Sequence, residues 1–124
     1  MAYAKELLEL GSIYGPPRGC VLIGYADNAP AGAICLRGLD AAHCEMKRLY
    51  VRKKHRRRGL ARALVEALLK EARAWNYQCM RLDTGTFMVE SQALYRSLGF
   101  RYMEPYYAVR DDLRNGLVYM ELPL

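Results

Sequence analysis

The segment that follows Gly59 constrains the fold most. Apolar residues recur there at helical spacing on a single stripe, which comprises Leu60, Ala61, Leu64, Val65, Leu68, Leu69, Ala72 and Trp75. Strand-like apolar segments stand on both sides of this helix, at residues 44–52 and 79–83. A strand, a long helix and a second strand in this order form a crossover unit, so the two strands are expected to be parallel neighbours in one sheet.

The rest of the chain predicts further strands and two shorter helices. The first helix depends on Leu7, Leu8 and Leu10, and the last one stops at Gly99, a residue suited to a helix C-cap. The order α-β-β-β-α-β-α-β-β over 124 residues predicts one α/β domain, residues 1–124, with a mixed sheet and helices on both faces. Besides the crossover unit, the predicted elements are a helix at 3–13, strands at 20–26 and 31–36, a helix at 89–98, and strands at 100–104 and 117–122.

The positive charge of the chain is concentrated in one segment. The sequence holds 19 Lys and Arg residues against 13 Asp and Glu residues, a net charge of +6. Eight of the basic residues and none of the acidic ones lie between Lys47 and Arg58, so the remainder carries 11 basic and 13 acidic residues. This distribution disfavours a nucleic-acid partner and favours a single local anion site.

Composition also argues against several other classes of protein. No apolar run approaches the roughly 20 residues that a membrane-spanning helix needs, and the first residues do not have the pattern of a secretory signal. The four cysteines have no C-x-x-C spacing and lie in apolar stretches, so we expect buried free thiols rather than metal ligands at Cys20, Cys35, Cys44 and Cys79. These features predict no membrane partner, no metal and a cytoplasmic location.

The basic segment runs directly into the long helix through Arg56-Arg57-Arg58-Gly59-Leu60-Ala61. The first amides of a helix have no intrahelical partner, and the helix dipole adds about half a positive charge there. Gly59 permits close approach of a ligand to the backbone, and Ala61 keeps the next turn small. A pyrophosphate fits this arrangement. A solvated basic loop or a nucleic-acid patch is the alternative, which the glycine at the helix start makes less favourable.

Two blocks of the sequence resemble those of a known enzyme family. Arg56-x-x-Gly59-x-Ala61 is similar to the R/Q-x-x-G-x-G/A motif that binds the acyl-CoA pyrophosphate in the GNAT N-acetyltransferase superfamily. The residues from Ala93 to Phe100 read A-L-Y-R-S-L-G-F and are similar to the A-L-Y-x-x-x-G-F block of that family. The resemblance covers about residues 18–124. It implies the GNAT acyl-CoA N-acyltransferase fold, with acetyl-CoA as acyl donor and no metal.

The resemblance also implies where acetyl-CoA binds. The strand Glu45 to Arg52 and the strand Met80 to Asp83 are expected to splay apart at a bulge, with the pantetheine arm in the gap. The arm would pair with main-chain groups near Leu49, Tyr50 and Val51. Arg56 and neighbouring cations would bind phosphate oxygens. The pyrophosphate would be held by the amides of Arg57, Arg58, Gly59, Leu60 and Ala61.

Two residues are implied for proton transfer. Tyr95 matches the tyrosine that lies over the thioester sulfur in this family, and a phenol with a pKa near 10 is protonated at neutral pH and can donate to a thiolate. Glu45 matches a position where some members carry a general base. Because side chains alternate along a strand, Glu45 is expected to share a face with Lys47 and Leu49. The alternative role for Glu45 is a strand-end carboxylate paired with Lys47 or Arg81.

The chain departs from the family pattern at two places. Met88 stands where many members carry an Asn that helps to hold the cofactor arm. The family usually begins with a strand and a helix before the helix expected at residues 3–13, and this sequence has no room for them. The domain is therefore expected to be shortened at its N-terminus. A sheet without that edge strand invites pairing with a second chain, which predicts a homodimer.

The acceptor side is less defined by the sequence. The segment Asp83-Thr84-Gly85-Thr86 either faces the acceptor or forms a solvated turn. The leading hypothesis is an N-acetyltransferase that transfers the acetyl group of acetyl-CoA to a primary amine of a small molecule or peptide by direct attack in a ternary complex. The alternatives are a non-catalytic acyl-CoA-binding domain and, more weakly, a nucleic-acid-binding module. Four phenols either wall the acceptor pocket or cover the sheet surface, namely Tyr102, Tyr106, Tyr107 and Tyr119.

Overall fold

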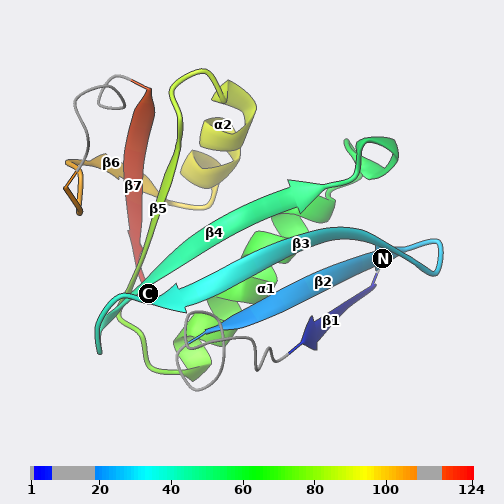
Figure 1. Ribbon diagram of the computed structural model, residues 1–124, viewed down its shortest axis with the longest axis horizontal. Helices are drawn as coiled ribbons and strands as arrows, with labels where there is room; N and C mark the ends of the chain where they lie inside the picture. The colour runs from blue at the N-terminus through cyan, green and yellow to red at the C-terminus, as the bar shows by residue number, and fades with distance from the viewer. Residues whose placement is uncertain (1, 7–18, 109–115) are drawn as a thin grey trace.

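Seven strands form one mixed sheet in the computed structural model, which describes residues 2–6, 19–108 and 116–124. The order of the described strands across the sheet is β1-β2-β3-β4-β5-β7-β6 (Figure 1). The strands β4 and β5 are parallel, and the other described pairs are antiparallel. The elements are β1 (Ala2–Glu6), β2 (Cys20–Ala26), β3 (Ala29–Gly38), β4 (His43–Val51), the 3-10 helix η1 (Lys53–His55), α1 (Leu60–Ala74), β5 (Cys79–Gly85), α2 (Val89–Ser97), β6 (Arg101–Met103) and β7 (Leu117–Pro123).

The predicted α/β fold class with a mixed sheet is confirmed, and so is the parallel crossover from β4 through α1 to β5. The strand β2 begins and ends where the sequence predicts it, and the later elements differ from their predicted bounds by one or two residues. Among the described residues, no helix is long and apolar enough to cross a membrane. Local periodicity of apolar residues therefore suffices to predict most of the helices and strands that the structure describes.

The helix expected at residues 3–13 is wrong for the part that the structure describes. Ala2–Glu6 form the strand β1, which pairs with β2 in antiparallel register from Ala2 and Tyr25 onward. Residues 7–13 lie outside the described residues. A segment of five residues is too short to show a period of its own, and its pairing with β2 decides its conformation. Since β1 pairs with β2, the edge that was expected to be bare is covered.

The helix α1 builds the core on one face of the sheet. It crosses behind β2, β3 and β4 in Figure 1 and contacts all three strands. A Cβ atom added at Gly24 of β2 would lie 2.8 Å from Leu60 Cδ1, so the glycine lets the first turn of α1 sit directly on the sheet. Most of the predicted apolar stripe is buried there, namely Leu60, Leu64, Val65, Leu68, Leu69 and Ala72.

The strand β4 has a bulge in its middle. Two of its residues, Arg48 and Leu49, lie opposite the single residue Ile34 of β3, and Arg48 has a φ of +57°. The extra residue shifts the alternation of side chains, so Leu49 packs against the α1 side of the sheet. The prediction that Leu49 shares a face with Glu45 and Lys47 is therefore wrong.

The parallel strands β4 and β5 pair only near their beginnings. Their register runs from His43 and Cys79 to Glu45 and Arg81, whereas β5 continues its pairing with β7 as far as Gly85. Figure 1 shows β4 turning toward the start of α1 while β5 rises beside α2. We call this opening, between β4 after Glu45 and β5 after Arg81, the β4–β5 fork. The expected splaying of the two strands at a bulge is thus observed.

Candidate active site

The connection from β4 to α1 leaves the start of the helix open. Arg57 and Gly59 both adopt left-handed conformations, with φ values of +64° and +80°, and Gly59 caps α1. A Cβ atom added at Gly59 would meet no atom within 4 Å beyond the adjoining chain. The amide of Ala63 donates to the Gly59 carbonyl at 3.1 Å, so the amides of residues 60–62 precede the first helical hydrogen bond. Such amides, together with the helix dipole, form an anion-binding group.

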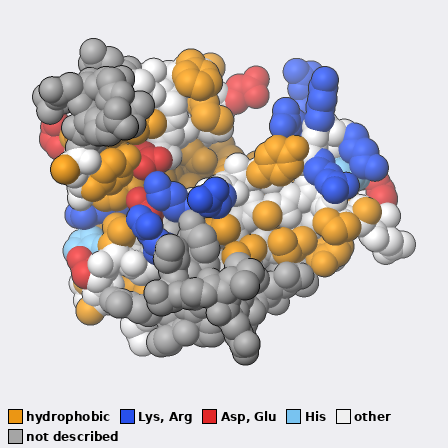
Figure 2. Space-filling view, in the orientation of Figure 1, with side chains coloured by type: hydrophobic (Ala, Val, Ile, Leu, Met, Phe, Trp, Pro, Cys, Tyr) orange, Lys and Arg blue, Asp and Glu red, His pale blue; other side chains and the backbone are white. Residues whose placement is uncertain are grey.

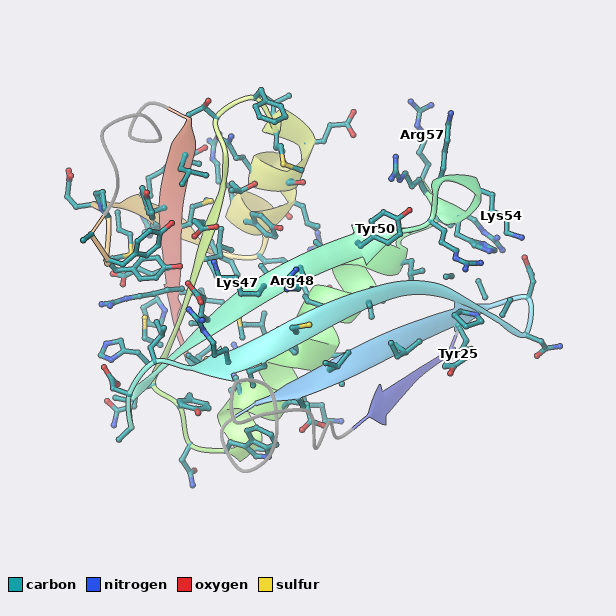
Figure 3. All side chains as sticks on the ribbon, viewed as in Figure 1. Tyr25, Lys47, Arg48, Tyr50, Lys54 and Arg57 are labelled. Carbon is teal, nitrogen blue, oxygen red and sulfur yellow. The ribbon has the colours of Figure 1, made fainter. Side chains whose placement is uncertain are left out.

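The three consecutive arginines that end the basic segment have different surroundings. Arg56 Nε donates to the Val51 carbonyl at 2.9 Å, which holds its guanidinium beside the end of β4. Arg58 pairs with Asp27 at 3.3 Å, and both side chains are at least half exposed. Such a surface pair contributes at most about 1 kcal/mol, so an anionic ligand can displace it. Arg57 projects away from the sheet in Figure 3. Of these three side chains, Arg56 is the one that the structure shows hydrogen-bonded to the end of β4.

Tyr95 lies on α2 and is directed into the core. Its ring contacts Phe100 edge-to-face, with the ring centres 5.9 Å apart, and only 5% of the residue is exposed. Burial raises the pKa of Tyr95 to about 12, so the phenol is protonated throughout the neutral range. A thiol has a pKa of about 8.5, so complete proton transfer from this phenol to a thiolate is unfavourable. The Tyr95 hydroxyl is better suited to donate a hydrogen bond to a leaving thiolate.

Glu45 lies at the branch of the β4–β5 fork and is fully buried. Its Oε1 atom accepts a hydrogen bond from Arg37 Nη2 at 2.6 Å. Its Oε2 atom accepts one from the Tyr106 hydroxyl at 2.5 Å and lies 3.5 Å from Lys47 Nζ. The sequence suggested Lys47 or Arg81 as the ion-pair partner of Glu45. Of these two, Lys47 pairs with Glu45 in the structure, whereas Arg81 pairs with Glu121 of β7. Two cations and one phenol thus surround this carboxylate.

A second carboxylate continues the same network. Asp83 Oδ2 lies 3.1 Å from Lys47 Nζ and accepts a hydrogen bond from the Tyr107 hydroxyl at 2.6 Å. The rings of Tyr106, Tyr107 and Tyr119 meet edge-to-face, with centres 5.1 to 5.8 Å apart. Burial, and then the hydrogen bonds to the two carboxylates, raise the pKa values of Tyr106 and Tyr107. Asp83 therefore faces this network rather than forming part of a solvated turn.

Two residues singled out in the sequence lie away from this network. Tyr102 is half exposed and donates a hydrogen bond to Gln92 at 2.8 Å. Met88 precedes α2 as its N-cap, and its sulfur lies 3.7 Å from the Thr84 hydroxyl. Met88 gives no side-chain hydrogen bond to the start of the helix, as an Asn could at that position.

The structure adds two residues that the sequence did not identify as site residues. Arg37 pairs with Glu45 across β3 and β4, and the two residues are register partners. The signal lies in the antiparallel register of β3 and β4, because directly opposed residues on one face interact. Tyr106 was noted as one of four phenols, but no local pattern connected it with Glu45, which lies 61 positions earlier.

The surface is hollowed beside the fork. Figure 2 shows the hollow between the side formed by β5 and α2 and the cluster of basic side chains near the start of α1. Main-chain groups of β4, the open helix start and the Tyr95 helix therefore border one region. These are the features that the resemblance implied for an acyl-CoA site.

Comparison with known proteins agrees with this geometry. The sequence profile described as "Acetyltransferase (GNAT) family" matches residues 2–100. The chain belongs to the GNAT acetyltransferase family. An N-acetyltransferase of Schizosaccharomyces pombe is 35% identical over 113 residues, which cover 90% of this chain and 68% of the relative. Human N-acetyltransferase 8 is 32% identical over 107 residues, covering 82% of this chain, which spans about half the length of that relative (47%).

Solved GNAT structures share the fold of this chain. An acetyltransferase from Streptococcus agalactiae superposes with a TM-score of 0.77 at 23% identity, covering 90% of this chain and 71% of its own. A GNAT family acetyltransferase from Elizabethkingia anophelis, solved with acetyl-CoA bound, gives a TM-score of 0.77 at 15% identity and covers 98% of both chains. At these identities the likeness concerns the GNAT fold alone.

Proposed function

We propose that this GNAT domain transfers the acetyl group of acetyl-CoA to a primary amine of a small molecule or peptide, by direct attack in a ternary complex. The observation that carries the proposal is the coincidence of the β4–β5 fork with the open start of α1. A splayed strand offers main-chain groups to an extended arm, and the helix start offers amides to its pyrophosphate. The N-acetyltransferase names of the relatives support the same reaction.

The proposed coenzyme site follows the chain from β4 into α1. Main-chain groups of Leu49, Tyr50 and Val51 pair with the pantetheine arm, and Arg56 contributes its charge beside them. The strand amides nearest the thioester also polarise its carbonyl by donating to the developing oxyanion. The pyrophosphate binds the amides of Arg57, Arg58, Gly59, Leu60 and Ala61.

Tyr95 is proposed to assist departure of the coenzyme. As the amine attacks, negative charge develops on the sulfur, and a protonated phenol stabilises it by donating a hydrogen bond. The pKa of Tyr95, raised to about 12, keeps that donor protonated at any pH at which the protein works. Its contact with Phe100 fixes the ring on α2.

Glu45 is proposed to receive the proton of the attacking amine through Tyr106. The Glu45 side chain is 1% exposed, so a substrate amine does not reach it directly, whereas Tyr106 is only partly buried. The Tyr106 hydroxyl already donates to Glu45. Its oxygen accepts a proton from the ammonium group while its own proton passes to the carboxylate. The net transfer is one proton from the amine to Glu45, and Tyr106 remains neutral.

The remaining expectations are proposals about the whole protein. Residues 1–124 are proposed to act as one N-acetyltransferase domain in the cytoplasm. A homodimer remains a prediction. The sequence suggested that β2 would be a bare edge, but β1 covers β2, so a second chain would have to pair with an edge strand, β1 or β6. Sedimentation decides it, since a dimer has twice the 14.2 kDa of one chain.

Two measurements test the proposed function in turn. Acetyl-CoA at a hundred times its Kd should raise the free energy of unfolding by about 2.7 kcal/mol, visible as a thermal shift. Free coenzyme A thiol should then appear only when an amine is present, and initial-rate lines should intersect, as a ternary complex requires. Parallel lines would indicate an acyl-enzyme instead. Binding without thiol release for any amine would make the chain a non-catalytic acyl-CoA-binding domain.

A further inference from the structure

The bulge in β4 brings two cations together beside the fork. In a regular strand Lys47 and Arg48 would point to opposite faces of the sheet. Here Arg48 is exposed, and its charge acts on the thiol of Cys35, which is the register partner of Lys47. Cys35 alternates with core residues of β3 and so lies on the face away from α1. Figure 3 shows Lys47 and Arg48 side by side on the face of β4 opposite to α1.

On this face the cations are more accessible than the carboxylates that they pair with. The Glu45 side chain is 1% exposed, against 37% for its partner Arg37. Asp83 is 17% exposed, against 27% for Lys47. Each carboxylate already accepts a hydrogen bond from a phenol, Glu45 from Tyr106 and Asp83 from Tyr107. A cationic group on an acceptor would find the acidic oxygens covered, whereas an anionic group would meet ammonium and guanidinium donors.

We infer that the acceptor is an amine with a carboxylate on the neighbouring carbon, as in a free α-amino acid, and that Lys47 and Arg48 bind this carboxylate. The inference rests on the proposed function and adds the substrate class. Lys47 and Arg48 stand at the bulge, directly before Leu49, the first of the three β4 residues proposed to contact the coenzyme arm. A carboxylate bound there lies beside the reacting amine, as it does in an α-amino acid. The inference excludes polyamines, which carry no carboxylate, and the N-termini of proteins, whose α-carbon bears an uncharged peptide carbonyl.

The same two cations are less well placed for the phosphates of the coenzyme. The pyrophosphate group is assigned to the start of α1, beyond the end of β4, and Arg56 already supplies a charge there. Lys47 instead lies deep in the fork, between Glu45 and Asp83. Binding of an acceptor carboxylate by Lys47 and Arg48 therefore leaves the coenzyme site unchanged.

A matched set of acceptors tests the inference with the unmodified protein. The twenty amino acids are screened by thiol release with acetyl-CoA, and the best of them is compared with its carboxamide and its decarboxylated amine. The free acid should exceed both in kcat/KM by about tenfold to a hundredfold, the usual contribution of hydrogen bonds to a charged group. Equal rates would overturn the inference and leave the proposed function intact. No turnover with any amine would overturn both.

Variants then assign the effect to the two cations. Lys47→Gln and Arg48→Gln should each lower the ratio of kcat/KM for the free acid over the carboxamide at least tenfold, with the KM for acetyl-CoA unchanged. Lys47→Gln also disturbs Glu45 and Asp83, but that disturbance lowers both rates together and leaves the ratio alone. Arg73→Gln, an exposed cation on α1, is the control. An unchanged ratio, or a raised KM for acetyl-CoA, would contradict the assignment.

Discussion

The two halves of the candidate site are built in different ways. The proposed coenzyme half is a contiguous stretch from β4 into α1, and its proposed binding groups are main-chain amides next to two left-handed residues, Arg57 and Gly59. The acceptor half is assembled from β3, β4, β5 and the segment after β6, and its groups are side chains in one hydrogen-bonded network around Glu45 and Asp83.

This difference determines how each half responds to substitution. A main-chain site depends on backbone conformation and on open space, so most side-chain changes there have small effects and a change at Gly59 has a large one. A side-chain network depends on every member, and the loss of one partner leaves another buried group unsatisfied. Substitutions in the two halves should therefore separate coenzyme affinity from turnover.

The largest expected effect is on the coenzyme half. Gly59→Val places a β-branched residue at a φ of +80°, which costs on the order of 1–3 kcal/mol, and fills the space in front of the first helix amides. The Kd for acetyl-CoA, measured by calorimetry, should rise about a hundredfold. Gly99→Val is the matched control, because Gly99 also has a positive φ (+102°) but lies after α2. Equal loss of affinity in both variants would show that strain rather than the site is responsible.

The next effect concerns turnover with the coenzyme bound. Tyr95→Phe removes the hydroxyl and keeps the ring in the core, so kcat should fall about a hundredfold while the Kd for acetyl-CoA stays the same. Since the pKa of Tyr95 is about 12, the wild-type rate should show no decline attributable to this group below about pH 10. Tyr102→Phe, at a half-exposed phenol, is the control. Full activity of Tyr95→Phe would remove Tyr95 from the mechanism.

A smaller effect tests whether the acceptor network acts as one unit. Glu45→Gln and Tyr106→Phe should each lower kcat by about tenfold, and the double variant should be no slower than the slower single variant, because both break one proton path. The Kd for acetyl-CoA should not change in any of the three. If the two residues had independent roles, the loss of kcat in the double variant would be the product of the losses in the two single variants.

The smallest effect appears in stability at high pH. The pKa of Tyr95 is about 12 in the folded protein and about 10 when the chain is unfolded. Its contribution to stability is complete below pH 10 and is lost as the pH rises toward 12, because the unfolded phenol ionises first. The free energy of unfolding should therefore decline from pH 10 to 12, and less steeply in Tyr95→Phe. Urea melts at these pH values provide the measurement, and parallel declines would contradict the assignment.

Most of the fold could be predicted from local pattern. The apolar stripe of α1, the strand pattern of β2 and the glycine that ends α2 each show a period or a stop signal within a few residues. β1 could not be predicted in this way, because its conformation comes from pairing with β2. A bulge was expected only by resemblance, and both its position at Arg48 and its consequence for Leu49 need the observed register.

The same reasoning explains which site residues the sequence identified. The motif from Arg56 to Ala61 is contiguous, so its residues could be named before the fold was known. Of the partners of Glu45, Lys47 could be named from the sequence. Arg37 and Tyr106 could not, because Arg37 depends on the register of β3 and β4, and Tyr106 reaches Glu45 from a distant segment. The acceptor class likewise depends on which charges remain exposed after folding, a property of the sheet face and not of any local pattern.

The most direct test of the coenzyme site is an NMR titration of the amide resonances with acetyl-CoA. If acetyl-CoA binds as proposed, the largest shifts should fall on residues 49–51 of β4 and 57–61 at the start of α1. The side-chain hydroxyl of Tyr95 should also become protected from exchange with solvent. Shifts confined to the segment after β6, or no shift at saturating acetyl-CoA, would show that the β4–β5 fork and the open helix start do not bind the coenzyme.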